Sequence, residues 1–256
     1  MNLRALGTSG GLPTDQGTMA FHLPPTTLLD AGTGVQHLEQ DALDSLSDVF
    51  ITHAHMDHVA GLPLLVDALF DTLTREQRTL TVRALPYTID ALRAHIFNDQ
   101  LWPDFTALPS HNAPVLRFHP LTLWDSIPVT GDPTRPITLT PFPLGHSIPT
   151  CGFLIREGET RIAVCGDTGL SQTSIDALNQ LGPLDQLYIE CALSNEREAL
   201  AAEACHLTPV RLTALLDALR VLPERIGITH LKPSLRSAIV DELKAALPTG
   251  TGWELV

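Results

Sequence analysis

The chain has 256 residues, of which 44% are hydrophobic and only 5% aromatic, so we expect a sizeable core built from Leu, Ile, Val and Ala. Its net charge is -13 at pH 7, and lysine occurs only at Lys232 and Lys244. This charge argues against a nucleic-acid-binding protein, because proteins that bind a long phosphate backbone carry basic patches whose binding releases counterions.

Apolar patterning in the first half predicts short strands interrupted by two helices. The dipeptides Leu85-Pro86 and Trp102-Pro103 interrupt the pattern, since proline ends regular elements. We expect strands at residues 2–6, 18–23, 26–30, 48–52 and 79–84, and helices at 59–75 and 87–99.

The second half repeats this style. Gly158, within Arg156-Glu157-Gly158-Glu159-Thr160, predicts a hairpin between two strands. Expected strands span residues 114–118, 137–142, 151–156, 160–165, 185–190 and 226–229, and expected helices span 173–181, 209–220 and 235–246. The alternation predicts an α/β protein in which two sheets pack together with helices outside, and we expect residues 1–256 to form a single domain.

The segment from Thr52 to His58 reads Thr-His-Ala-His-Met-Asp-His and follows the apolar run of residues 48–51. His53 and His55 alternate with Ala54, so on an extended backbone they project to one side and can bind one cation. Asp57 and His58 then turn towards a second cation. A surface histidine cluster is the alternative interpretation.

Two such ions need roughly seven protein ligands, one of them bridging, with a shared water or hydroxide. Three further candidates stand where expected strands give way to loops, namely His146, Asp167 and His230. A carboxylate has two oxygens whereas a neutral imidazole offers one nitrogen, so Asp167 is the natural bridge. The sequence therefore predicts a site for two metal ions.

These motifs, in this order, resemble the metallo-β-lactamase superfamily, and Leu29-Asp30-Ala31-Gly32 and Gly166-Asp167-Thr168 belong to the same pattern. The resemblance implies a four-layer αββα sandwich of two mixed sheets with outer helices. It also implies that His53, His55 and His146 bind one metal, that Asp57, His58 and His230 bind the other, and that Asp167 bridges them. Asp30 would orient a ligand or its loop; a simple turn residue is the alternative.

The last third is most similar to the class II 3',5'-cyclic-nucleotide phosphodiesterases. The similar segments are Tyr188-Ile189-Glu190-Cys191, Cys205-His206-Leu207-Thr208-Pro209 and Ile228-Thr229-His230-Leu231-Lys232-Pro233. The chain departs from that family at Met56, where Leu is typical, and near Asp67-Ala68, where a Ser-Pro or Ser-Ala pair is typical. These departures bear on the substrate more than on the metals.

His206 is the candidate general acid. The departing alkoxide of a phosphodiester needs a proton, and Glu190 is placed to raise the pKa of the imidazole towards the protonated form. The alternative is an ordinary histidine before a helix with Thr208 as N-cap and Pro209 in its first turn. His206, Glu190 and Asp57 are thus the candidate catalytic residues.

The resemblance implies hydrolysis of cyclic AMP, cyclic GMP or both to 5'-monophosphates through a metal-bound hydroxide. The two divalent ions are expected to be Zn²⁺, with Mn²⁺ or Fe²⁺ as alternatives, because histidine and aspartate suit several metals. The expected partner is a small cyclic nucleotide, with no membrane, no other cofactor and a possible homodimer. Preference between the two nucleotides and oligomeric state are left open.

Two alternatives to this function remain. Ribonuclease Z, a sister family, has a similar Glu and His arrangement, so an RNA-processing or other small-phosphodiester hydrolase is the second hypothesis. The acidic charge, and the lack of a Gly-rich arm that could hold tRNA, make a nucleic-acid partner less favoured. A non-enzymatic binding module is the third hypothesis, and the full ligand set argues against it.

Residues 100–136 are the hardest to interpret. With Trp102, Phe105, Phe118 and Trp124 they could form a lid that stacks on a purine, an irregular wrap or a dimer contact. Lys232 could reach a substrate phosphate or lie exposed in a loop. The remaining histidines, which have no motif context, are interpreted as structural or exposed: His22, His37, His95, His111 and His119.

The amino terminus lacks the apolar stretch of a signal peptide and no apolar run approaches membrane-spanning length, so we expect a cytoplasmic protein. The four cysteines show no close pair, which fits a reducing compartment. We interpret them as core residues, with metal or redox roles as the alternative: Cys151, Cys165, Cys191 and Cys205.

Overall fold

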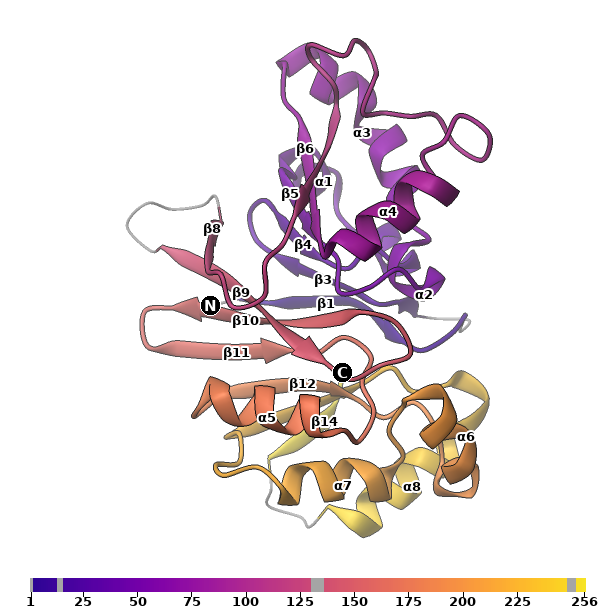
Figure 1. Ribbon diagram of the computed structural model, residues 1–256, viewed down its shortest axis with the longest axis vertical. Helices are drawn as coiled ribbons and strands as arrows, with labels where there is room; N and C mark the ends of the chain where they lie inside the picture. Colours follow the sequence, from indigo (N-terminus) through magenta and orange to yellow (C-terminus); the bar gives the residue numbers. More distant parts are fainter. Residues whose placement is uncertain (1, 13–15, 130–135, 248–251) are drawn as a thin grey trace.

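The computed structural model describes residues 2–12, 16–129, 136–247 and 252–256, which fold into two mixed seven-stranded sheets packed face to face. Helices cover the two outer faces (Figure 1). In spatial order the first sheet consists of β2 (Gly17–Thr18), β1 (Arg4–Ser9), β3 (Ala20–Leu23), β4 (Thr27–Leu29), β5 (Asp48–Phe50), β6 (Leu80–Ala84) and β7 (Leu116–Pro120).

The second sheet is formed by strands from the second half of the chain. Their spatial order is β14 (Trp253–Leu255), β13 (Arg225–Thr229), β12 (Gln186–Glu190), β11 (Thr160–Val164), β10 (Thr150–Glu157), β9 (Ile137–Leu144) and β8 (Ile127–Val129). Strands β11 to β14 run parallel, whereas β8 to β11 pair antiparallel, and Gly158, with φ of 58°, forms the hairpin predicted from the sequence.

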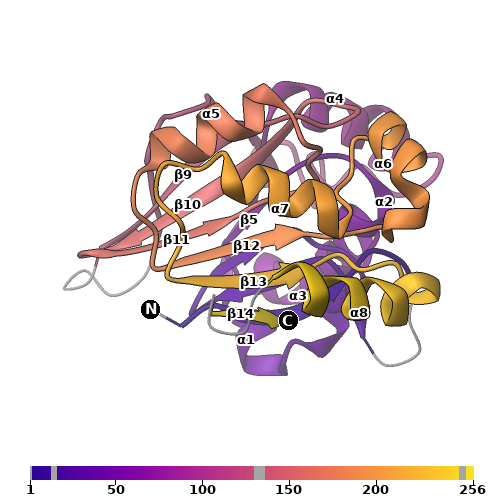
Figure 2. The same cartoon turned by 90° about the horizontal axis from the view of Figure 1, so that it is seen from below.

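Each outer layer packs leucine-rich helix faces on one sheet. On the first sheet these are η1 (Thr33–His37), α1 (Gln40–Ser45), α2 (Met56–Val59), α3 (Leu62–Glu76) and α4 (Pro86–His95). The second sheet is covered by α5 (Gln172–Leu181), α7 (Pro209–Asp217), η3 (Pro233–Leu235) and α8 (Arg236–Ala246), seen from below in Figure 2. Beside them lie η2 (Asn195–Arg197) and α6 (Glu198–Ala204), where Ala201 packs in a small separate cluster with Ala192 and Leu193. Burial of apolar side chains at helical spacing drives this packing.

A third core lies between the sheets. Phe50 of the first sheet meets Phe153 of the second with ring centroids 5.5 Å apart, and Phe21 meets Tyr188 at 5.2 Å. The four-layer α/β architecture expected from the sequence is therefore confirmed. The single domain expected over residues 1–256 stays a prediction, and residues 1, 13–15, 130–135 and 248–251 of that range lie outside the described residues.

Several element boundaries differ from the prediction. The helix expected at 59–75 is two helices, because Gly61 packs against the Gly32 carbonyl where a Cβ would lie 2.4 Å away. The strand expected at 18–23 is divided into β2 and β3, and the helix expected at 87–99 ends at His95. Elements α1, α6, β8 and β14 were not predicted, since each is short and packing rather than periodicity defines it.

The lid interpretation of residues 100–136 is wrong for Phe105. This side chain is only 3% exposed and packs against Phe70 and Phe97 in the core beneath α3 and α4. Trp102 is half-buried and packs on the same core. Of this stretch, residues 130–135 lie outside the described residues.

Candidate metal centre

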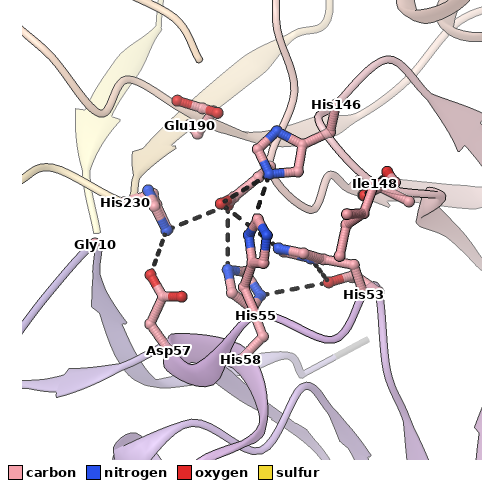
Figure 3. Close-up of polar contacts among 12 residues, drawn as sticks. Gly10, His53, His55, Asp57, His58, His146, Ile148, Glu190 and His230 are labelled. Atoms are coloured by element: carbon pink, nitrogen blue, oxygen red, sulfur yellow. Dashed lines mark hydrogen bonds and ion pairs between the residues drawn. The ribbon is translucent and has the colours of Figure 1, made fainter. Parts of the chain in front are cut away.

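The candidate site lies along the carboxyl-terminal edges of strands from both sheets. His53 follows β5, His146 follows β9, Asp167 follows β11 and His230 follows β13. In open α/β sheets the carboxyl ends of strands form the crevice in which ligands bind. Figure 3 shows the labelled histidines and Asp57 converging from these loops.

Four side chains form the first group of possible ligands, namely His53, His55, His146 and Asp167, with their ligating atoms within 4.8 Å of one another. Oδ2 of Asp167 lies 3.7 Å from Nε2 of His53 and 3.8 Å from Nε2 of His146. Nδ1 of His55 lies 3.3 Å from Nε2 of His146. The alternation of His53 and His55 therefore points both rings at one position.

Asp57, His58 and His230 form the second group. Nε2 of His230 lies 3.0 Å from Oδ2 of Asp57, and the rings of His58 and His230 stack with centroids 5.5 Å apart. Asp57 and His58 both stand in the single turn of α2, and the ring of His58 lies 4.2 Å from that of His53. The two groups are those that the resemblance implies.

Asp167 faces both groups with different oxygens. Oδ1 lies 3.1 Å from Nε2 of His58 and 3.2 Å from Nε2 of His230, whereas Oδ2 faces His53 and His146. Burial acts to raise the pKa of Asp167, but the imidazoles of His230 and His58 hold it well below the ordinary value. An ionised carboxylate with one oxygen towards each group has the geometry of a bridging ligand.

Three of the imidazoles, those of His53, His58 and His146, fit metal ligation because protein groups contact their Nδ1 atoms and leave Nε2 facing the cluster. Nδ1 of His53 lies 3.0 Å from Oγ1 of Thr52, and Nδ1 of His146 lies 2.9 Å from the carbonyl of Cys205. Nε2 of His53 is buried without a hydrogen-bond partner, and Nε2 of His58 is buried facing Asp167. Burial lowers the pKa of His53, His55 and His146, which favours the neutral form that binds metals. The donor set thus fits two divalent cations.

Asp30 holds His58 from the side opposite to Asp167. Its Oδ2 lies 2.7 Å from Nδ1 of His58, and its Oδ1 accepts from the backbone N–H of Thr52 at 2.8 Å. Burial lowers the pKa of His58, but Asp167 and Asp30 outweigh this and hold it well above the ordinary value. The expectation that Asp30 orients a ligand agrees with these contacts.

A close approach of the amino-terminal loop supports His230, whose φ is 63°. The backbone N–H of His230 donates to the Thr8 carbonyl at 2.6 Å, and a Cβ on Gly10 would lie 2.3 Å from the His230 carbonyl. Only glycine fits this position. Lys232 donates from Nζ to the Gly10 carbonyl, so it is half-buried and held by this loop rather than free in solvent.

His206 and Glu190 lie together beside the two groups. Nδ1 of His206 is 2.7 Å from Oε1 of Glu190, and the His206 ring lies 5.1 Å from that of His146 and 5.5 Å from that of His230. Burial acts to lower the pKa of His206, but the Glu190 carboxylate raises it to about 8. Thr208 is the N-cap of α7, as the alternative interpretation expected, and the general-acid role of His206 stays a prediction.

Glu190 also fixes the surrounding backbone. Its Oε1 accepts from the N–H of Thr168 at 2.9 Å, and its Oε2 accepts from the N–H groups of Ala192 and Leu207, each at 3.1 Å. The buried carboxylate therefore joins the loops that carry Asp167 and His206. Sequence reasoning missed the supporting roles of Thr52, Thr168 and Gly10, because these depend on contacts between distant loops.

Residues without motif context stay outside the cluster. His22 is buried in β3, while His37, His95, His111 and His119 are exposed. Burial raises the pKa of Cys151, Cys165 and Cys191, which fits thiols that pack in the core. Cys205 instead contributes its carbonyl to His146.

Comparison with known proteins gives the family. The Beta-lactamase superfamily domain matches residues 26–231, which span the site from β4 to His230. The chain belongs to the metallo-β-lactamase superfamily. Among solved structures, this superfamily member is similar to unliganded yeast PDE1, with a TM-score of 0.74 and 21% identity over 99% of this chain and 95% of the other, a likeness that shows the fold.

Two curated relatives indicate which branches of the superfamily are similar. The 3',5'-cyclic-nucleotide phosphodiesterase 1 of Saccharomyces cerevisiae is 27% identical over 240 residues, covering 80% of this chain and 62% of that protein. Ribonuclease Z of Synechococcus sp. strain CC9605 is 45% identical over 78 residues, 27% of this chain and 24% of that protein. The chain spans between 59% and 66% of the length of the phosphodiesterase relatives that it matches.

The helices of the described residues give no candidate for a membrane span, because none combines sufficient length with sufficient apolarity.

Proposed function

We propose that this protein is a dinuclear metal-dependent phosphodiesterase that hydrolyses 3',5'-cyclic nucleotides to 5'-monophosphates. The observation that carries the proposal is the His206–Glu190 pair, which lies against a cluster of seven possible ligands. Similarity to proteins named 3',5'-cyclic-nucleotide phosphodiesterase over about four fifths of the chain supports the choice of substrate.

The seven possible ligands would divide between two metal ions. His53, His55 and His146 would bind one ion, Asp57, His58 and His230 the other, and Asp167 would bridge them. Two bound divalent cations, with zinc favoured by the histidine-rich set and Mn²⁺ or Fe²⁺ possible, would neutralise phosphate oxygens and lower the pKa of water. The two ions would then bind a substrate phosphate at the edge where the loops converge.

His206 would supply the proton to the departing 3' oxygen. Glu190 holds Nδ1, so Nε2 is the nitrogen left to donate towards the substrate. A ring nitrogen of His206 lies within 4.8 Å of ligating atoms of Asp167 and His230, and this proximity supports a proton donor beside the proposed phosphate position. Positioned general acids of this kind typically contribute about 10²- to 10⁴-fold in rate.

The second candidate function is RNA processing of the ribonuclease Z type, which the local 45% identity favours. The chain's net charge of -13 argues against it, because binding of a long phosphate backbone relies on cationic side chains. A single small phosphodiester can instead be bound by the two cations and the loops around them.

Turnover of 3',5'-cyclic AMP and cyclic GMP by purified protein of known metal content tests the proposal. We expect 5'-monophosphate as product, no turnover in Asp167→Ala, and a loss of about 10²-fold or more in His206→Ala with both metals retained. His119→Ala, which changes an exposed histidine outside the site, is the matched control.

Two results would redirect the assignment. Cleavage of precursor tRNA without cyclic-nucleotide turnover would favour the ribonuclease Z alternative. Full activity of His206→Ala would remove the general-acid role.

A further inference from the structure

Ser174 connects the loops of two candidate ligands. Its side chain is fully buried in the first turn of α5, where Oγ accepts a hydrogen bond from the backbone N–H of Gly145 at 3.0 Å. The same Oγ lies 2.7 Å from Oγ1 of Thr168 and 2.8 Å from Oγ of Ser171. Gly145 precedes His146 and Thr168 follows Asp167, so a single hydroxyl contacts the neighbours of both ligands.

The hydrogen-bond capacity of Ser174 is fully used. A hydroxyl has one donor and two acceptor positions. Every group is satisfied when Ser174 accepts from Gly145 and Ser171 and donates to Thr168, whose own hydroxyl donates to the Gly169 carbonyl at 3.3 Å. Ser171 in turn accepts from the N–H of Ser174 as the N-cap of α5. No substitution without a hydroxyl can make the same contacts.

The close packing around Gly145 supports this connection. A Cβ on Gly145 would lie 2.1 Å from Oγ of Ser171, so only glycine brings this backbone against α5. The N–H of Gly169 donates to the Gly145 carbonyl at 2.8 Å, which joins the two loops a second time. The loops of His146 and Asp167 therefore move together with the start of α5.

We propose that Ser174 is a positioning residue that fixes His146 relative to Asp167 and thereby controls metal binding at the position these residues form with His53 and His55. This inference rests on the proposed dinuclear site and deepens it. The effect is expected to be selective because His146, whose loop Ser174 holds through Gly145, belongs to the first group alone. Other contacts hold the loop of Asp167 and the second position: Glu190 binds the backbone of Thr168, Asp30 holds His58, and Thr8 holds the backbone of His230.

Metal titration against a chromophoric chelator tests the inference, with Zn²⁺ and Co²⁺ as probes. In Ser174→Ala we expect one of the two ions to bind about 10- to 100-fold more weakly, as is typical for removal of a supporting contact, and the other to bind within twofold of wild type. Ser171→Ala is the matched control, since it removes the N-cap of α5 but leaves the contacts of Ser174 with Gly145 and Thr168.

Two further variants show which of the two metal positions is weakened by Ser174→Ala. His55→Ala disables the first position and Asp57→Ala the second, so Ser174→Ala should weaken the remaining ion only in the Asp57→Ala background. Thr168→Val removes one contact of Ser174 and should weaken the same ion, whereas Thr168→Ser retains the hydroxyl and should restore it. If Ser174→Ala does not fold, the comparison of Thr168→Val with Thr168→Ser tests the inference instead.

Unchanged binding of both ions in Ser174→Ala, or equal weakening of both, would overturn the positioning role while leaving the proposed function intact. Equal effects of Ser171→Ala and Ser174→Ala would attribute the loss to α5 stability and also overturn it. Wild-type protein that binds no pair of ions would overturn the proposed function and this inference together.

Discussion

Oε1 of Glu190 lies 2.7 Å from Nδ1 of His206 and 2.9 Å from the backbone nitrogen of Thr168. One carboxylate oxygen thus contacts both the candidate proton donor and the loop of the candidate bridging ligand. Because Glu190 is buried and accepts four hydrogen bonds, it holds the proposed proton donor His206 in a fixed position relative to the loop of Asp167.

Glu190→Gln should lower kcat by about 10²-fold, because an amide holds the His206 imidazolium less well than a carboxylate. Glu190 raises the pKa of His206, so its removal lowers that pKa and the protonated form is lost at lower pH. The alkaline limb of the kcat/KM profile should therefore move to lower pH than in wild type. Glu224→Gln, at an exposed glutamate, should leave the profile unchanged.

Asp57 and Asp167 should differ in their effect on metal content. Asp57→Ala should remove one equivalent, because Asp57 stands in the second group alone, whereas Asp167→Ala should weaken both ions. Activity should fall roughly 10³-fold or more in each variant, equivalent to about 4 kcal/mol of transition-state stabilisation. Atomic absorption after gel filtration measures the content, and two equivalents retained in Asp167→Ala would contradict a bridging role.

Asp30→Asn tests the support of His58 without disturbing the backbone. Asp30 has φ of 56°, a left-handed conformation that asparagine adopts readily, so the substitution keeps the turn. It replaces the carboxylate that contacts Nδ1 of His58, and we expect about 10- to 100-fold weaker binding at the second metal position. Wild-type affinity at both positions would show that Asp30 acts only as a turn residue.

Phe105→Ala should destabilise the fold without changing substrate binding. Its ring is 3% exposed among Phe70, Phe97 and their neighbours, so truncation should cost about 3–5 kcal/mol in the free energy of unfolding. Urea denaturation measures that loss, and KM for the cyclic nucleotide should remain at the wild-type value. A raised KM with unchanged stability would instead restore the lid interpretation.

The sequence by itself determined the fold class and the residues of the cluster. The spacing of His53, His55, Asp57 and His58 carries information because the four lie within one short segment, where local geometry limits the directions of their side chains. Alternating strand and helix patterns indicated an α/β protein for a similar reason, since periodicity is a local property, and the family resemblance implied its two packed sheets. The family match over residues 26–231 agrees with this fold class.

Only the tertiary structure decided how these pieces meet. The contacts of Asp30 with His58 and of Ser174 with Gly145 join residues 28 and 29 positions apart. Such pairs depend on the register of strands and on the packing of helices against sheets, which no local pattern specifies. The burial of Phe105 is decided in the same way, because an aromatic residue in an irregular segment can face either solvent or core until the neighbouring helices are placed.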